Sequence, residues 1–229
     1  MKPHLKKMWC MGRITPEFIW RMEDVLHQYE LPYDPKRPKI NFDERPCQLI
    51  GDVVQPIQME PGNVKLEDYE YERNGVCNLF VALEPQPGKR VCAVFQHRTG
   101  SEYAMFMKML SDLHYPDAEK IVIIQDNLNT HNPGSFYKVF SPEEAYELAS
   151  RFEFHYTPKK ASWLNMAEIE LSVISKQCLD RRIATQEQLK NEVYAFVEER
   201  NRIKATVNWS FTNTKARQKL KRHYPTNIN

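Results

Sequence analysis

Three acidic residues are the first candidates for chemistry in this chain of 229 residues. Asp43 and Asp126 each follow an apolar segment with the composition of a strand, residues 39–42 and 121–124. Ligands of open α/β sheets bind outside the carboxyl ends of strands, so two carboxylates delivered there could share a cation. Mg²⁺ prefers oxygen ligands and keeps waters or substrate phosphates in its shell. The pattern therefore indicates a carboxylate site for a hard metal ion.

The third carboxylate, Glu168, lies near the start of a segment predicted to be one long helix from residue 162 to about residue 182. Ser172 and Ser175 follow it at steps of 3 and 4 residues, which places all three on one polar stripe. Glu170 points about 200° away, at about 100° per residue, toward apolar neighbours. The helix geometry favours Glu168 as the third ligand and leaves Glu170 as an alternative.

Each acid also has an ordinary interpretation when it is taken alone. An Asp at the end of a strand is more often a turn or capping residue than a catalytic one. A Glu on a helix is usually solvated. Only the combination of two strand-end acids with a polar helix stripe makes a metal site as well supported as the ordinary interpretation. The residue types and their spacing support no stronger conclusion.

The elements that must position these acids alternate along the chain. Thr15 and Pro16 predict a helix over residues 15–29, followed by a Pro-rich linker. The remaining predicted elements are a hairpin of strands 76–83 and 90–95, a helix from Ser101, an apolar strand at 121–124, a helix capped by Ser141, a strand at 152–156, and a helix capped by Thr185 after the long helix. This order predicts an α/β fold with a mixed β-sheet flanked by α-helices.

The composition is that of an ordinary globular protein, with 41% hydrophobic and 27% charged residues. No run approaches the roughly 18 apolar residues that span a bilayer. The start of the chain is charged but lacks the apolar run of a secretory signal, so we expect a cytoplasmic location and no membrane partner. The five cysteines are widely spaced, which predicts reduced thiols: Cys10, Cys47, Cys77, Cys92 and Cys178.

The net charge of +2 says little about partners, whereas its distribution says more. Residues 215–223 form a basic cluster, and two further basic pairs are Lys159 with Lys160 and Arg181 with Arg182. Such clusters can neutralise phosphates. A solvated charged surface is the equally weighted alternative when charge alone is considered.

Four sequence blocks resemble the IS630 family of bacterial insertion-sequence transposases, in the wider Tc1/mariner superfamily. They are DERPCQL at 43–49, DYEYERNG at 68–75, QDNLNTH at 125–131, and HYTPK at 155–159 leading into SWLNMAE at 162–168. The resemblance runs through nearly the whole chain. It implies an RNase H-like fold, in agreement with the order of elements.

The resemblance also implies the DDE site of a transposase. Its acidic triad maps onto Asp43, Asp126 and Glu168, as catalytic and metal-binding residues, and the family's spacing of three residues from Asn to Glu favours Glu168 over Glu170. The implied mechanism is phosphoryl transfer with two Mg²⁺ ions, for which Mn²⁺ can substitute. Asn127 and His131 are expected near the scissile phosphate, or else in a turn that positions Asp126.

The implied partner is double-stranded DNA, both transposon ends and target, bound by a possible homodimer. Lys159, Lys160, Arg181 and Arg182 are the candidates for contacts with the DNA backbone. We expect residues 1–37 to form a linker with one helix, 38–205 the catalytic domain and 206–229 a basic C-terminal tail.

One departure concerns the start of the chain. Family members carry helix-turn-helix modules before the catalytic domain, and we expect residues 1–37 to be only the end of such a region. Two other hypotheses stay open: a nuclease of the same fold, and an inactive or truncated remnant that only binds DNA.

Overall fold

The computed structural model describes residues 14–57, 59–63, 66 and 68–224, so the charged start of the chain and Cys10 lie outside it. The strands are β1 (Lys39–Asp52), β2 (Tyr71–Glu84), β3 (Lys89–Phe95), β4 (Ile121–Gln125) and β5 (Phe152–Tyr156). The α-helices are α1 (Pro16–Glu30), α2 (Gly100–Met109), α3 (Pro142–Arg151), α4 (Ala167–Gln177), α5 (Gln186–Arg202) and α6 (Asn213–Lys219). Shorter helical turns cover Leu110–His114, Pro133–Lys138, Ser162–Leu164 and Lys221–His223.

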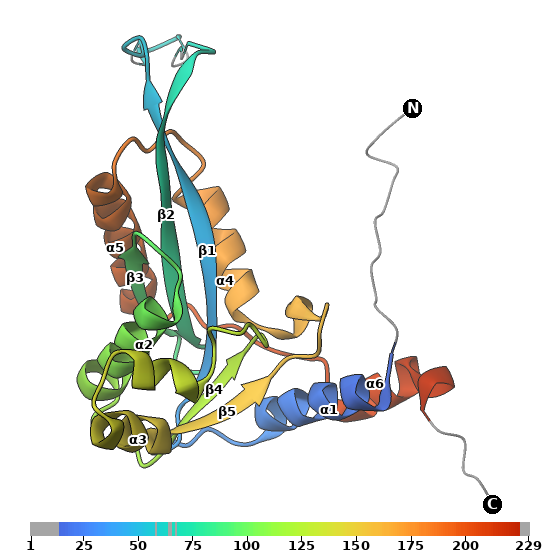
Figure 1. Cartoon of the computed structure of the whole chain (residues 1–229). Coiled ribbons are helices and arrows are strands. Elements are labelled where there is room, and N and C mark those ends of the chain that lie inside the picture. The colour runs from blue at the N-terminus through green and yellow to red at the C-terminus, as the bar shows by residue number, and fades with distance from the viewer. Residues whose placement is uncertain (1–13, 58, 64–65, 67, 225–229) are drawn as a thin grey trace, which may run out of the picture.

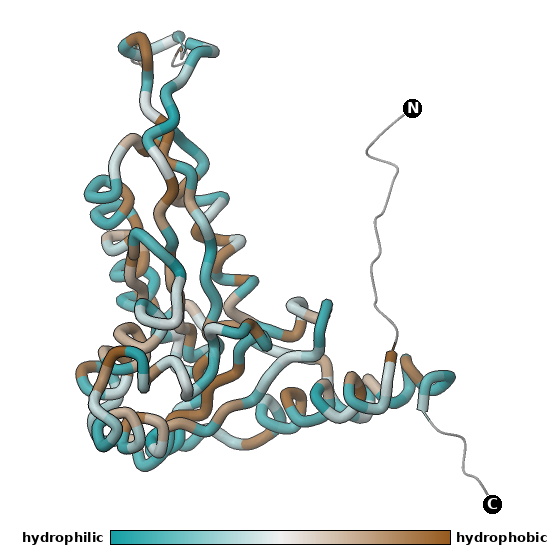
Figure 2. Tube along the Cα trace, in the orientation of Figure 1, coloured by the Kyte–Doolittle hydropathy of each residue, from teal (hydrophilic) through white to brown (hydrophobic). Residues whose placement is uncertain are grey.

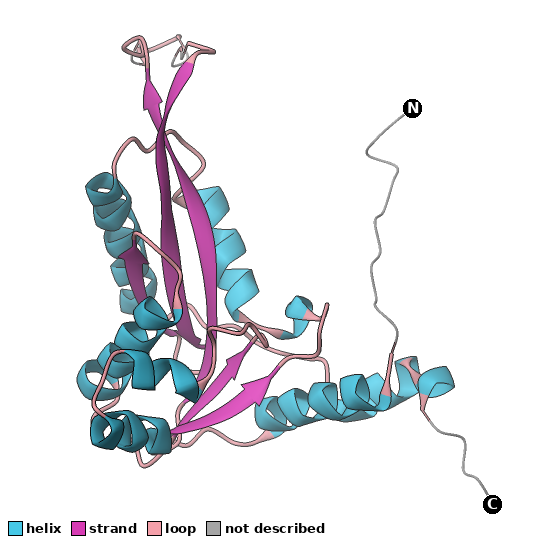
Figure 3. Ribbon diagram, in the orientation of Figure 1, coloured by secondary structure: helices cyan, strands magenta, loops and turns pink. Residues whose placement is uncertain are grey.

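The five strands form one mixed sheet in the order β3-β2-β1-β4-β5 (Figures 1 and 3). β1, β2 and β3 are antiparallel neighbours, whereas β1, β4 and β5 run parallel. Every residue of β4 is buried, and the four residues before Gln125 are hydrophobic (Figure 2). A parallel strand covered on both faces has this composition. The predicted mixed sheet with flanking helices is therefore confirmed.

Alternate residues of the central strands supply two hydrophobic cores. Phe42 and Phe80 pack with Phe106 of α2 on one face of the sheet. Leu79 on the opposite face packs with Leu171 of α4, in a cluster that includes α5. This alternation follows from the twofold side-chain period of a strand. Helices therefore cover both faces, with α2 and α3 on one and α4 and α5 on the other.

β1 differs from the prediction of a short strand that ends at Asp43. It is a single strand of 14 residues, and Asp43 lies within it, opposite Val81 of β2. The parallel pairing with β4, however, ends at Asn41. β3 still pairs with β2 as far as Asn78, opposite Pro46 of β1, and beyond that point β1 and β2 continue as a two-stranded arm (Figure 1). Asp43 is therefore at the edge of the parallel part of the sheet although it is not at the end of its strand.

The turn between β2 and β3 confirms the predicted hairpin. Gly88 has a left-handed φ of 70°. A Cβ atom added there would lie 2.8 Å from the carbonyl carbon of Lys204, so the site requires glycine for two reasons.

The long helix predicted from residue 162 to 182 is wrong at both ends. A short turn, Ser162–Leu164, comes first, and Asn165 then takes an extended conformation because its side chain bonds to β1. α4 begins at Ala167 and ends at Gln177. Nε of Arg181 donates to the carbonyl of Cys178 at 3.1 Å, which satisfies a backbone group at the helix end and turns the chain away.

A third hydrophobic cluster joins the two ends of the described chain. Phe18, Met22 and Leu26 of α1 pack with Leu164 and with Ala216 of α6. The segment that follows α5 therefore folds back along α1 (Figure 1). Within the described residues, no helix is both long and apolar enough to cross a membrane.

Candidate active site

The register of β1 and β4 brings Asp43 and Asp126 to one edge of the sheet. Asn41 pairs with Ile124 in the parallel ladder, and each acid lies two residues beyond its strand's member of that pair. Equal offsets in a parallel pair place side chains on the same face. The two carboxylates thus follow neighbouring strands on one side of the sheet.

Asn165 fixes the start of α4 beside the same edge. Its Nδ2 donates to the carbonyl of Phe42 at 2.8 Å, and its Oδ1 accepts from the backbone of Ala167 at 3.1 Å. Asn165 is 1% exposed, so both bonds are protected from water. The first turn of α4 is therefore attached to the residue directly before Asp43, and this turn carries Glu168.

Asp43 and Glu168 line one open cavity of about 410 Å³. Ser172 and Ser175 lie along its wall, as the helical spacing predicts. The other lining residues are Glu44, Arg45, Pro46, Leu171 and Lys176. The polar stripe of α4 thus faces the acids of β1.

The electrostatics of this edge disfavour charge on Asp43. Burial and the nearby Glu168 carboxylate raise the pKa of Asp43 to about 7, against the backbone N–H of Glu44, which donates to the carboxylate and lowers it. The charges of Glu44 and Asp126 add smaller upward effects on this pKa. A cation between the carboxylates would relieve this repulsion, and carboxylate oxygens are the ligands that Mg²⁺ and Mn²⁺ accept. The donor set therefore suits a hard divalent ion, although no group of three or more His, Cys, Asp or Glu in the described part of the chain is already gathered as a metal site.

His131 links Asp126 to a fourth acid, Glu44. Its Nδ1 lies 2.5 Å from Oδ1 of Asp126, and its Nε2 lies 2.9 Å from Oε2 of Glu44. Burial of the ring opposes its charge, but the bonds to Asp126 and Glu44 prevail and raise the pKa of His131 to about 9. At neutral pH the ring is therefore a cation shared by two carboxylates.

The imidazole of His131 packs against two aromatic rings as well as binding the two carboxylates. It stacks on Tyr103 at a centroid distance of 5.0 Å and meets the edge of Phe42 at 5.2 Å. The side chain of Gln125 donates to the carbonyl of His131 at 2.9 Å. A ring fixed in this way sets the orientation of the Asp126 carboxylate. Asn127, the other residue predicted near the site, is exposed beside it.

Glu170 has a different environment from Glu168. Its side chain is 0% exposed and pairs with Arg90 at 2.9 Å and with Arg200 at 2.7 Å. Both carboxylate oxygens are therefore occupied by guanidinium groups that join α4 to β3 and α5. Glu170 is a buried structural acid and is not available to a ligand in the cavity.

The predicted DNA-contact residues fall into two groups. Lys159 and Lys160 are exposed on the loop that follows β5. Arg181 binds Glu192 at 2.5 Å, and Arg182 binds Asp52, the last residue of β1, at 2.7 Å. The structure thus brings the two lysines near the acidic edge and engages both arginines with protein groups elsewhere.

Sequence reasoning missed the roles of Glu44 and Asn165. Glu44 directly follows Asp43, and its partner His131 lies five residues after Asp126, so Glu44 and His131 both belong to the sequence blocks that carry the resemblance. Proximity in sequence to the two acids was the only available signal for the Glu44–His131 pair, because its two members lie in distant segments of the chain.

Comparisons with known proteins agree with this geometry. Residues 39–190, more than half of the chain, match the family described as DDE superfamily endonuclease. The chain belongs to this family. No curated protein sequence matches it significantly.

The fold is that of the Mos1 mariner transposase catalytic domain. A crystal structure of that domain aligns with a TM-score of 0.54 and 10% identity, covering 86% of this chain and 96% of the other. The Mos1 mariner paired end complex with Mn aligns with a TM-score of 0.56 and 13% identity, covering 88% and 63%. The Mos1 strand transfer complex gives 0.56 and 12%, covering 88% and 62%. The chain therefore spans less than two thirds of the Mos1 chain in these complexes, and the predicted RNase H-like fold is confirmed.

Proposed function

We propose that this chain is the catalytic domain of an IS630-type transposase, which cleaves DNA at the ends of an insertion sequence and joins the ends to a target. The observation that carries the proposal is that Asp43 of β1 shares a cavity with Glu168 of α4 and is acted on by the charges of both Glu168 and Asp126, the residue after β4. Membership of the DDE endonuclease family supports the same chemistry.

Asp43, Asp126 and Glu168 would hold two Mg²⁺ ions, or Mn²⁺ in their place. When bound, such ions polarise the scissile phosphate, activate the attacking hydroxyl and stabilise the leaving oxygen. The charges of both Glu168 and Asp126 act on Asp43, which makes Asp43 the candidate for the shared ligand. Asn165 keeps Glu168 against β1, so the third ligand does not depend on a mobile loop.

Glu44 and His131 would act on the site through Asp126. The ring leaves one oxygen of the Asp126 carboxylate for a ligand and fixes the other at Nδ1. Groups that orient a metal ligand typically change metal affinity by about 10–100-fold when removed. Asn127, exposed next to Asp126, is placed where it could contact a phosphate oxygen.

The proposed substrate is double-stranded DNA, and the whole enzyme would act as a dimer assembled on it, in the cytoplasm of a bacterium beside the nucleoid. Lys159 and Lys160 are the nearest cations to the acidic edge among the predicted contact residues. DNA contacts of Arg181 and Arg182 stay a prediction, since both now hold carboxylates of the protein.

The test is a nicking and strand-transfer assay with Mg²⁺ on DNA that carries the element ends. Asp126→Asn and Glu168→Gln should each lower the rate by on the order of 10⁴-fold while the thermal unfolding temperature is kept. Asp117→Asn, which changes an exposed acid in a loop, is the matched control and should cleave normally. Normal cleavage by either site variant would refute the assignment, and DNA binding without any cleavage by the parent chain would indicate a remnant.

A further inference from the structure

The C-terminal part of the described chain has an unusual charge distribution. The last acidic residue of the sequence is Glu199, whereas basic residues continue through Lys219, Lys221 and Arg222. A one-sided run of this kind repels itself unless acids elsewhere in the fold compensate it. Whether they do depends on what the segment packs against.

α6 docks on α1 through its apolar face. Ala216 is 0% exposed and Leu220 packs against the same cluster. Thr212 caps the helix through the backbone of Lys215. Burial of this face directs Lys219 to solvent, and Lys221 and Arg222 are exposed in the turn that follows.

Three acids of α1 form ion pairs with groups other than Lys219, Lys221 and Arg222. Glu23 pairs with Arg217 at 2.6 Å, and Glu17 pairs with Arg21 at 3.0 Å. Asp24 pairs with Nδ1 of His155 at 2.7 Å. Of these pairs, Glu23–Arg217 joins α1 to α6, and Glu30 accepts from the backbone of Asn213 at the start of α6.

The exposed cations that follow Arg217 in the sequence have other surroundings. Lys219 lies over the ring of Phe211 at 5.6 Å, and Nε of Arg222 lies 3.0 Å from Nε2 of His223. Within the parts of the chain that the structure describes, neither they nor Lys221 form an ion pair with an acid. Their positive potential is directed outward.

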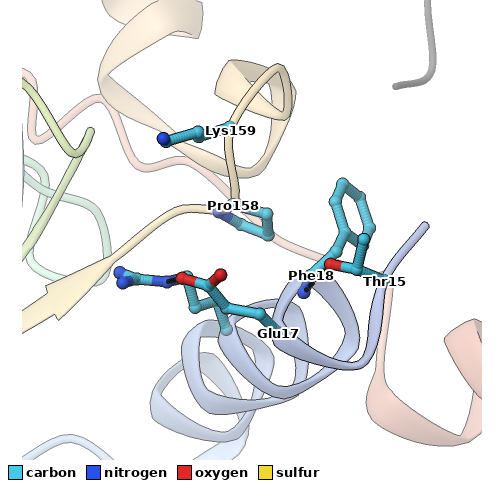
Figure 4. Close-up of a pocket in the computed structure, with 6 residues that line it drawn as sticks. Thr15, Glu17, Phe18, Pro158 and Lys159 are labelled. Atoms are coloured by element: carbon cyan, nitrogen blue, oxygen red, sulfur yellow. Dashed lines mark hydrogen bonds and ion pairs between the residues drawn. The ribbon is translucent and has the colours of Figure 1, made fainter. Parts of the chain in front are cut away.

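The segment that carries these cations contacts the loop that follows β5 through Phe211. β5 is parallel to β4, with Tyr156 opposite Gln125, so the loop after β5 leaves the sheet where Asp126 lies. Pro158 and Lys159 line one pocket together with Glu17 and Phe18 of α1 (Figure 4). Further along the same loop, Trp163 contacts Phe211 at 5.8 Å, next to α6.

We propose that Lys159, Lys160, Lys219, Lys221 and Arg222 form one basic surface that binds the phosphate backbone of duplex DNA flanking the cleaved phosphate. The proposal rests on the proposed function, because that function supplies the partner. Exposed cations of this type neutralise phosphates and position a duplex without reading its sequence. The fold thereby gives the catalytic domain its own means of holding DNA, beside the acids.

The experiment measures binding of the chain to a fluorescein-labelled duplex of random sequence by anisotropy, in EDTA and over a range of salt concentrations. The triple variant Lys219→Ala, Lys221→Ala, Arg222→Ala should bind about 10–100-fold more weakly. Its slope of log affinity against log salt should fall by up to about 0.9 for each phosphate that the variant no longer neutralises. The matched control is Lys36→Ala, Lys138→Ala, Lys190→Ala, which removes the same charge from other faces and should change both quantities little.

A charge-conserving variant separates electrostatics from folding. Lys219→Arg, Lys221→Arg, Arg222→Lys should bind as the parent does, whereas a purely structural role would be disturbed by both triple variants. Equal affinity and salt slope in the alanine triple and its control would overturn the surface. Because EDTA removes divalent metal, this result is independent of cleavage: a chain that binds as expected but never nicks DNA refutes the proposed function alone.

Discussion

Glu168 and Glu170 lie two positions apart on α4, yet their surroundings are opposite. Glu168 is exposed in a cavity that it shares with Asp43, and its charge raises the pKa of that neighbouring carboxyl group. Glu170 is fully buried between two arginines. The same contrast extends through the molecule, where Glu23 and Asp24 are paired with cations while the acids of the sheet edge repel one another.

The difference distinguishes acids that hold the fold together from acids kept for a ligand. A buried carboxylate is tolerated only when its charge is matched and its oxygens are bonded. An unmatched cluster costs stability and persists where a cation can occupy it. Three substitutions test this division, from the largest expected change in free energy to the smallest.

Glu170→Gln should destabilise the fold most. The variant leaves the fully buried Arg90 and the mostly buried Arg200 without a counter-charge, so we expect a loss of about 3–5 kcal/mol in the free energy of unfolding. Chemical denaturation measures it. Glu168→Gln on the same helix is the control and should change stability by less than about 0.5 kcal/mol. Equal effects of the two would remove the distinction between them.

Glu44→Gln should weaken metal binding. The amide still fills the space beside His131 but no longer shares its charge, so the whole cation acts on Asp126 and competes with a bound ion. We expect the affinity for Mn²⁺ to fall about 10–100-fold in calorimetric titration. Glu143→Gln, on the exposed start of α3, is the control and should bind as the parent does. An unchanged affinity in the Glu44 variant would show that the pair does not act on the site.

Asp43→Asn should stabilise the metal-free chain slightly. The folded pKa of Asp43, about 7, is above its unfolded value of 3.8, so the native state keeps a proton that the unfolded chain releases. Stability therefore falls as pH rises from about 4 through about 7. The variant should lose this part of the pH dependence and unfold at a higher temperature than the parent at pH 8, where the parent must charge Asp43 against burial and like-charged neighbours. Scanning calorimetry at pH 5 and pH 8 measures both, and a variant that melts lower at pH 8 would contradict the like-charge account.

Local patterns determined much of this protein from the sequence. The apolar run of β4, the capping residues Thr15, Ser141 and Thr185, and the Pro-Gly turn after β2 each predicted an element that the structure contains. Helical spacing separated Glu168 from Glu170. These features depend on residues within a few positions of one another, which is why they can be read without the fold.

Only the tertiary structure decided how the acids are held. The side chain of Asn165 donates to β1 across a sequence separation of 123 residues. Because of this contact, α4 begins only at Ala167, and its first turn lies beside β1, with Glu168 near Asp43. The pairing of Arg90 with Glu170 spans 80 residues and makes one of two neighbouring acids structural. Asp43 lies within its strand because β2 continues beyond the end of the β4 ladder, which no local pattern encodes. The sequence identifies the carboxylates, whereas contacts between distant segments set their charge balance and access to a cation.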